Sequence, residues 1–379
     1  MTLDNVVGLT ALGITRLAEQ GTLDTLGITI WAAIRPAARS LVVTNGKGTN
    51  STQARICAIM EAFECACAED WERLTIKFAS INELLTEDRQ FIDLRRFLKC
   101  HPKTLDPNVR RHWVAGHVAD QEPTLVPYEM VGLDLTVPSR WDQERFGMCS
   151  VGIAAHPDRD RAISAALLEA IENDARAIAT ALPGHAAQCP RLDPDTLNEA
   201  WITALKAKLI AASSWLELID ITTDIALPTV LCLIRGDASG TSLQMRHAGC
   251  ACRGTYKAAA EAAIMEATQS RATHIAGARD DITSDSFATR HTSDVFPKTL
   301  TPIPTLEKDA PFPNFQTIQK YLTSAELNGA PVICELSPLG SSASCVSVLV
   351  PDLELVSSSN RPVRHGPRLA KYALRQLVT

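Results

Sequence analysis

The sequence predicts an α+β protein, because two kinds of segment alternate along its 379 residues without the strict β-α-β rhythm of a parallel sheet. The first kind is short, rich in β-branched residues and bounded by Pro, Gly or Ser, as is typical of strands. The second kind carries apolar residues at helical spacing over longer runs. We therefore expect mixed sheets with alanine-rich helices, forming one catalytic-sized unit with subdomains over residues 1–379.

Each element follows from one of these two patterns. Strands are predicted at 28–33, 40–44, 229–234, 332–336 and 345–350. Helices are predicted at 51–68, 160–180, 194–212, 255–274 and 317–327. Residues 281–313 are rich in Thr, Ser and Pro and only weakly periodic, which predicts a long loop. After a Ser-rich turn the chain ends in a basic segment that predicts a further helix.

Composition and charge argue against several classes of protein. The net charge of −6 disfavours nucleic-acid binding through bulk charge. No secretory signal opens the chain and no window approaches the ~18 apolar residues of a membrane span, so we expect a soluble, cytoplasmic protein. Eleven cysteines without an export signal indicate reduced thiols. The Cys65/Cys67 and Cys250/Cys252 pairs lack the spacing of a structural zinc site.

A short pattern recurs near the end of three small-residue helical runs. It reads "MEAFE" at 60–64, "LEAIE" at 168–172 and "MEATQ" at 265–269. In each copy two polar residues stand at i and i+3, so both lie on one face of the helix. The flanking alanines allow other backbones to approach closely. The three pairs are Glu61/Glu64, Glu169/Glu172 and Glu266/Gln269.

Two interpretations of these pairs stay open. Burial of several carboxylates is costly unless a cation lies between them, and magnesium prefers oxygen ligands. Repetition of the pattern on three helices therefore favours a shared magnesium-type site. The alternative is three amphipathic helices whose glutamates lie on solvated faces.

The stretch Gly46-Lys47-Gly48 is a candidate anion-binding segment just before the first of these helices. Its glycines allow backbone approach and its lysine can pair with phosphate. It is neither a Walker A loop nor a G-x-G-x-x-G fingerprint, and an ordinary surface turn is the alternative. Arg271 would supply a second phosphate-pairing cation if the third helix joins the site.

The sequence resembles the YcaO-domain family over nearly the whole chain. The resemblance is carried by the five segments "LDTLGITIWAAIRPAARSLVVTNGKG", "ARICAIMEAFE", "WVAGHVADQEPTLVPYEMVGLDLT", "SVGIAAHPDRDRAISAALLEAIENDA" and "AAIMEATQSRATHIAGARDD". The first and last are the most specific, and they look like the branch often found beside TfuA-type partner proteins. The resemblance implies mixed sheets and alanine-rich helices around a central nucleotide site.

The resemblance also implies a function. Family members use ATP and Mg2+ to activate a backbone amide of a ribosomally synthesised peptide by phosphorylating its oxygen. An attacking Cys, Ser or Thr side chain then gives an azoline, whereas an external sulfide gives a thioamide. An amidine product stays open as well. The implied partners are a precursor peptide and a leader-binding, TfuA-like or dehydrogenase protein, and a homodimer would fit the family.

Functional residues are carried over position by position. Lys47 matches the family's GKG lysine, and Arg16 aligns with a family arginine near the N-terminus. The implied magnesium ligands and nucleotide contacts come from the three acidic helices: Glu61, Glu64, Glu169, Glu172 and Glu266 for the metal, with Gln269 and Arg271 closing the third helix. Cys252 matches a family cysteine, although a buried thiol is the simpler interpretation.

Departures from the family pattern cluster in one region. Val151 and Pro157 stand where asparagines are usual, Arg161 stands where a glutamate is usual, and Asn173 replaces an arginine. The chain also lacks the Pro-x-Pro-x-Pro ending of many azoline-forming members. Two hypotheses therefore stay open: an active peptide-modifying enzyme, or a degenerate scaffold that binds a peptide or docks a partner without ATP turnover.

Overall fold

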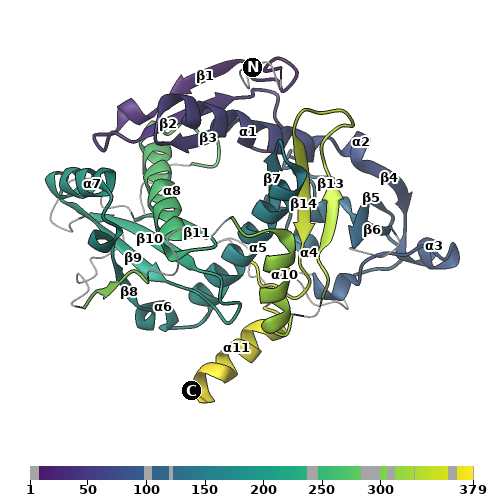
Figure 1. The fold of residues 1–379 in the computed structure, drawn as a ribbon. Helices are drawn as coiled ribbons and strands as arrows, with labels where there is room; N and C mark the ends of the chain where they lie inside the picture. The colour runs from purple at the N-terminus through teal and green to yellow at the C-terminus, as the bar shows by residue number, and fades with distance from the viewer. Residues whose placement is uncertain are drawn as a thin grey trace.

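The computed structural model describes residues 8–97, 105–118, 123–236, 246–282, 299–304, 312–327, 329–356 and 365–378. Within these residues the strands form three sheets joined by long helices (Figure 1). The N-terminal sheet is antiparallel and contains β1 (Arg16–Glu19), β2 (Thr29–Ile34) and β3 (Val43–Gly48) in that order.

The other two sheets are larger and mainly antiparallel. One has the order β11-β10-β9-β8-β12, built from β8 (Arg191–Asp193), β9 (Ser214–Asp220), β10 (Thr229–Gly236), β11 (His247–Cys252) and β12 (Thr301–Pro302), of which β12 runs parallel to β8. The other has the order β4-β5-β13-β14-β7, with β6 beside β5. Its members are β4 (Thr75–Ala79), β5 (Arg111–Val118), β6 (Thr124–Pro127), β7 (Ile153–His156), β13 (Val332–Glu335) and β14 (Ser344–Leu349).

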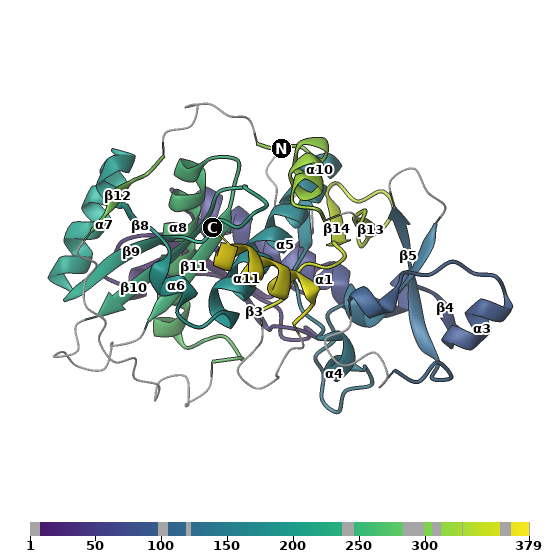
Figure 2. The same ribbon diagram turned by 90° about the horizontal axis from the view of Figure 1, so that it is seen from below.

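Three long helices connect the sheets: α1 (Ser51–Glu69), α5 (Arg159–Ala181) and α8 (Tyr256–Ala276). The other helices of the described residues are α2 (Trp71–Leu74), α3 (Ile81–Thr86), α4 (Gln143–Phe146), α6 (His185–Gln188), α7 (Ala200–Ala211), α10 (Phe315–Ser324) and α11 (Pro367–Val378), with 3-10 turns η2 (Gly21–Leu23), η3 (Leu94–Arg96), η5 (Tyr128–Met130) and η6 (Pro194–Leu197). Helix α5 lies between the two larger sheets in both views (Figures 1 and 2) and contacts β11 as well as β7 and β14.

Capping fixes where each long helix begins. The side chains of Asn50, Asp158 and Thr255 accept hydrogen bonds from backbone N–H groups in the first turns of α1, α5 and α8. Such caps satisfy donors that have no partner within the helix. The predicted helices 51–68, 160–180 and 255–274 are therefore confirmed to within one or two residues.

Close approach of strand and helix explains why α1 and α8 are rich in alanine. A Cβ placed on Gly46 in β3 would overlap the backbone of Ala58 in α1. A Cβ placed on Gly249 in β11 would likewise overlap the backbone of Ala267 in α8. Only glycine fits at these two strand positions, and small helix residues opposite allow the contact.

Several predicted boundaries were wrong. The strand predicted at 40–44 begins at Val43 and continues to Gly48, so Lys47 lies in a strand and not in a turn. The helix predicted at 194–212 is interrupted by Asn198, whose φ of 55° is left-handed and ends η6 before α7 starts. The helix predicted at 317–327 starts earlier and ends at Ser324, because Glu326 has a φ of 60°.

The remaining predictions about organisation have mixed outcomes. The α+β class and the C-terminal helix are confirmed. Most of the loop predicted at 281–313 lies outside the described residues, and residues 301–302 within it form β12. None of the described cysteines forms a disulfide. In the part of the chain that the structure describes, every helix is too short or too polar to cross a membrane.

Candidate functional site

The three alanine-rich helices bring five carboxylates into one group, which we call the acidic cluster. Its members are Glu61 and Glu64 on α1, Glu169 and Glu172 on α5, and Glu266 on α8. Burial raises the pKa of the first four, and mutual repulsion raises it further. Glu64 is affected by Glu61 and Glu169, and Glu169 by Glu172 and then Glu61. Burial and the charge of Glu266 raise the pKa of Glu172 to about 8.

The members of the cluster differ in their contact with water and backbone. Protein atoms surround Glu61 closely, yet part of its side chain stays exposed, so it lies on the open side of the cluster. Glu64 is half-buried, and its Oε1 accepts a hydrogen bond of 2.6 Å from the Ala155 N–H of β7. The backbone N–H of Gly152 bonds to Glu169 and partly offsets its raised pKa. The segment that leads into α5 therefore orients one carboxylate on each of two helices.

Lys47 is the cation nearest to the cluster among the described ion pairs. Its Nζ lies 3.9 Å from Oε2 of Glu266, across the contact between β3 and α8. Its charge also lowers the pKa values of Glu61 and Glu172 against the effect of burial. One lysine thus interacts with carboxylates on all three helices, but it cannot neutralise five of them.

Three arginines that the sequence reasoning missed also act on the cluster. The charge of Arg279 lowers the pKa of Glu61, and the charges of Arg253 and Arg176 lower that of Glu172. Arg176 could have been found, because it follows Glu172 by four residues and i, i+4 side chains are neighbours on a helix. Arg253 and Arg279 flank α8 and had no comparable signal.

The residues that close the third helix make specific contacts of their own. Gln269 Nε2 donates to the carbonyl oxygen of Asn45, beside Lys47, at 3.1 Å. Within the described residues, Gln269 Oε1 and Asn45 Oδ1 are buried without a hydrogen-bond partner. Buried polar atoms without a protein partner are typical of places where a water molecule or an ion binds. Asn45 Nδ2 donates to Gln20 Oε1 at 2.6 Å, so the amide is held in place.

Two predicted cations are not engaged with the cluster. Arg271 is buried and its Nε donates to Asp24 Oδ2 at 3.0 Å. Arg16 lies exposed on β1, and none of the described contacts joins it to the acidic cluster. Their assignment to a nucleotide therefore stays a prediction.

The residues that depart from the family pattern have separate environments. Pro157 and Arg161 are exposed at the start of α5. Asn173 is buried, and its Oδ1 accepts a hydrogen bond of 3.0 Å from the backbone N–H of Val356. Val151 lines a cavity described below. Asn173 thus holds the C-terminal segment against α5. Cys252 is fully buried, which raises the pKa of its thiol to about 12 and favours a structural role.

The donor set fits a hard divalent cation carried by a polyphosphate. Carboxylates with raised pKa values are those that a cation would stabilise most. No three His, Cys, Asp or Glu side chains converge on one ion position within the described residues. Magnesium usually binds through one or two carboxylates and completes its shell with water and phosphate oxygens. An open group of carboxylates beside a lysine therefore suits a magnesium–nucleotide complex better than a bare metal.

Comparison with known proteins shows the family of the chain. A family model described as YcaO cyclodehydratase, ATP- and Mg2+-binding, matches residues 45–354. The chain belongs to this family, whose cofactors are ATP and Mg2+.

Among its relatives is the uncharacterized protein in the tfuA 3' region of Rhizobium leguminosarum bv. trifolii. The two are 32% identical over 275 residues, covering 71% of this chain and 64% of that relative. An uncharacterized protein of Methanothermobacter thermautotrophicus is 31% identical over 291 residues, covering 74% of this chain and 71% of that relative. The chain thus spans slightly under two thirds of the length of the first relative.

Two solved structures share the fold. One is described as a heterocyclase in complex with substrate and cofactor. It has a TM-score of 0.78 at 16% identity, and the match covers 100% of this chain and 55% of the heterocyclase chain. The other is YcaO from Methanopyrus kandleri bound with AMPPCP and Mg2+. It has a TM-score of 0.67 at 18% identity, and the match covers 96% of this chain and 94% of the Methanopyrus chain. At such identities the likeness shows the fold alone.

Proposed function

We propose that the protein is an ATP-dependent enzyme that modifies a backbone amide of a ribosomally synthesised peptide, by cyclodehydration to an azoline or by thioamidation. The observation that carries this proposal is the acidic cluster, in which three helices present carboxylates around Lys47. Membership of the YcaO family supports the use of ATP and Mg2+.

The chemistry of cyclodehydration balances with ATP as the only co-reactant. A Cys, Ser or Thr side chain of the peptide loses its proton and adds to the carbonyl carbon of the preceding amide. The carbonyl oxygen becomes an anion and takes the γ-phosphoryl group, which releases ADP. The addition has already closed the ring, so the amide nitrogen then loses its proton while the phosphate leaves, and the C=N bond that forms completes the azoline. In thioamidation an external sulfide adds instead, and loss of phosphate leaves C=S.

The residues of the chain divide into two roles in this scheme. Glu61, Glu64, Glu169, Glu172 and Glu266 would hold magnesium, which when bound neutralises charge on the triphosphate. Lys47 places a positive charge where the phosphoryl group carries negative charge during transfer. The side-chain nucleophile belongs to the peptide, so the site needs none of its own.

A partner protein and a peptide substrate are part of the proposal. The relative from the tfuA 3' region supports a TfuA-like partner. A structure of the same fold, described as the E. coli microcin synthetase McbBCD complex with pro-MccB17 bound, supports a peptide substrate and a multi-protein assembly. A homodimer stays a prediction.

The test is calorimetric titration of ATP, with magnesium, into the purified protein and into two variants. Glu61→Gln removes one charge from the cluster with little change in shape. Glu72→Gln makes the same change at an exposed position on α2 and serves as the matched control. We expect micromolar binding by the wild type and by Glu72→Gln and none by Glu61→Gln. Equal binding by all three proteins would show that the acidic cluster is not part of the nucleotide site.

A second candidate function is a scaffold that binds a peptide or docks a partner without turnover of ATP. Asn173 favours it, because this residue stands where the family has an arginine and is engaged with the backbone of Val356. A wild-type protein that binds a peptide or a TfuA-like partner but never ATP would support this second function.

A further inference from the structure

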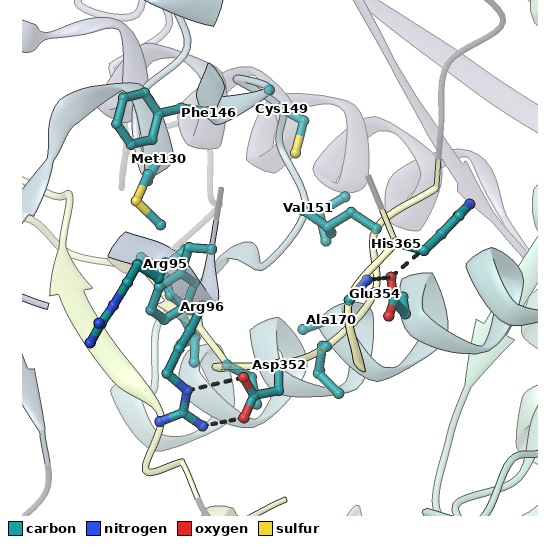
Figure 3. Close-up of a pocket in the computed structure, with 18 of the residues that line it drawn as sticks. Arg95, Arg96, Met130, Phe146, Cys149, Val151, Ala170, Asp352, Glu354 and His365 are labelled. Carbon is teal, nitrogen blue, oxygen red and sulfur yellow. Dashed lines mark hydrogen bonds and ion pairs between the residues drawn. The ribbon is translucent and has the colours of Figure 1, made fainter. Parts of the chain in front are cut away.

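A cavity of about 230 Å³ lies beside α5, between the segment that follows α4 and the C-terminal part of the chain (Figure 3). Its interior is mostly apolar. Phe97, Met130, Phe146, Val151 and Val350 are among the side chains that line it. Figure 3 shows Met130, Phe146 and Val151 arranged around the same space.

The charged residues of the wall have partners of opposite charge: Arg95 pairs with Asp93 outside the wall, and the others pair with one another. Arg96 Nε donates to Asp352 Oδ1 at 3.0 Å, and His365 Nδ1 lies 3.5 Å from Glu354 Oε2 (Figure 3). Glu354 also accepts a hydrogen bond from the backbone N–H of Gly366 at 3.0 Å. A charged ligand would have to break these pairs, whereas an uncharged, apolar group would leave them intact.

The cavity shares its wall with the acidic cluster. Val151 lines the cavity, while the backbone of the next residue, Gly152, bonds to Glu169. Ala170 also lines the cavity and directly follows Glu169 on α5. Because neighbouring Cα atoms are about 3.8 Å apart, the cavity and the cluster are separated by about one residue of chain.

Size determines which part of a ligand fits. Pockets for whole small-molecule ligands have volumes of about 300–1,000 Å³. A cavity of about 230 Å³ is too small for a nucleotide, yet it has room for a single large side chain. The basic residues among the described lining residues are paired with carboxylates, which also disfavours a triphosphate.

We propose that this cavity binds a large apolar side chain of the peptide substrate, close to the amide that is modified. This inference rests on the proposed function, because it places the reacting amide at the acidic cluster. The enzyme would then select peptides that carry an aromatic or large aliphatic residue near the Cys, Ser or Thr to be modified. The paired charges at the rim would exclude acidic and basic side chains.

Cys149 makes the proposal measurable, because its exposed thiol lies on the wall of the cavity. The experiment follows alkylation of Cys149 by N-ethylmaleimide with peptide mass spectrometry, in the absence of ATP. Three capped tripeptides are compared: acetyl-Gly-Phe-Gly-amide, acetyl-Gly-Glu-Gly-amide and acetyl-Gly-Gly-Gly-amide. Cys189, a half-buried thiol outside the cavity, provides the reference rate in the same sample.

We expect the phenylalanine peptide to slow alkylation of Cys149 several-fold relative to Cys189, and the other two peptides to have no effect. Val151→Phe fills the cavity, so this variant should lose the protection. Equal rates with all three peptides in the wild type would overturn the proposal even if the variant failed to fold. Protection by the glutamate peptide, or protection that persists in a folded Val151→Phe protein, would also overturn it.

The outcome of this experiment can be distinguished from that of the ATP titration. If the protein binds ATP but no peptide protects Cys149, the proposed enzyme function stands and the proposed subsite is wrong. If a peptide protects Cys149 but ATP does not bind, the cavity is a peptide site on a scaffold.

Discussion

Helix α1 carries two kinds of carboxylate only a few residues apart. Glu69 is buried and fully engaged, because Arg35 donates to both of its oxygens at 3.2 and 2.6 Å and the Ser40 backbone N–H donates to Oε1 at 3.0 Å. Glu61 and Glu64, on the same helix, belong to the acidic cluster and face other carboxylates. One helix thus contains a carboxylate paired with an arginine and two carboxylates that face like charges.

Helix α5 repeats the contrast. Asp174 is completely buried, yet Arg368 Nε donates to both of its oxygens at 2.8 and 2.9 Å and the Glu354 N–H donates to Oδ1 at 2.9 Å. Glu169 and Glu172, less than two turns earlier, repel each other and Glu266. Carboxylates paired with arginine join distant segments of the chain, whereas the carboxylates of the acidic cluster face one another. Such groups of like charges with raised pKa values are typical of functional sites.

The largest effect is expected at a satisfied carboxylate. Glu69→Gln would leave the buried Arg35 without a counter-charge, and loss of one partner of a buried pair costs about 3–5 kcal/mol. Chemical denaturation of the variant should show this fall in the free energy of unfolding. The exposed Glu72→Gln control should stay within about 0.5 kcal/mol of the wild type. A loss at Glu69 no larger than the control's would remove the distinction between the two kinds of carboxylate.

The second largest effect is expected in the acidic cluster, where a substitution should weaken the binding of ATP without destabilising the fold. Glu64→Gln keeps an acceptor for the Ala155 N–H but removes a negative charge from the cluster. We expect affinity for ATP with magnesium to fall about 100-fold, as at other metal ligands and their supports, while stability without magnesium stays equal or rises. Calorimetry and denaturation of the same sample test both parts. A large loss of stability would show that Glu64 is a structural residue like Glu69.

The positions of the cluster carboxylates on the three helices could be predicted from the sequence. The alanine-rich periodicity and the caps define α1, α5 and α8, and the i, i+3 pairs place carboxylates on one face of each. The satisfied acids could not be predicted, since their partners are distant in sequence. Asp174 meets Arg368 only because the C-terminal segment folds back on α5.

Strands were harder to predict than helices. Strand β9 was missed because a charged residue lies at its centre: Glu217 is buried between Arg191 and Arg235, whose Nε atoms lie 2.8 and 2.5 Å from its oxygens. The end of β3 was missed because glycine normally weakens strands. There the tertiary contact with α1 outweighs the local preference.

A smaller loss of ATP affinity should follow from removing the charge of Lys47, which lies beside the acidic cluster. Lys47→Met keeps the length of the side chain on β3 but takes away the charge 3.9 Å from Glu266. We expect about a 10-fold loss of affinity for ATP with magnesium, equivalent to about 1.4 kcal/mol. Lys77→Met on β4 is the matched control, since Lys77 pairs with Glu87 at 2.6 Å on the surface. Unchanged affinity in Lys47→Met would place the phosphates elsewhere.

The smallest effect concerns a buried group that stays neutral instead of being paired. His247 is almost fully buried beside Arg271 and His274, and burial, followed by these two neighbours, lowers its pKa to about 3. The unfolded chain binds a proton on this residue below about pH 6.5, whereas the folded protein does not, so stability is lost as the pH falls from there towards 3. Between pH 7.5 and pH 5.5 the histidine should cost about 1 kcal/mol in the free energy of unfolding.

Denaturation of His247→Gln at these two pH values should show a decline in the free energy of unfolding that is smaller than that of the wild type by this amount. The matched variant His117→Gln, altered at an exposed histidine on β5, should decline as the wild type does. An equal decline in all three proteins would mean that another group, and not the uncompensated imidazole beside Arg271, sets the acid sensitivity of the fold.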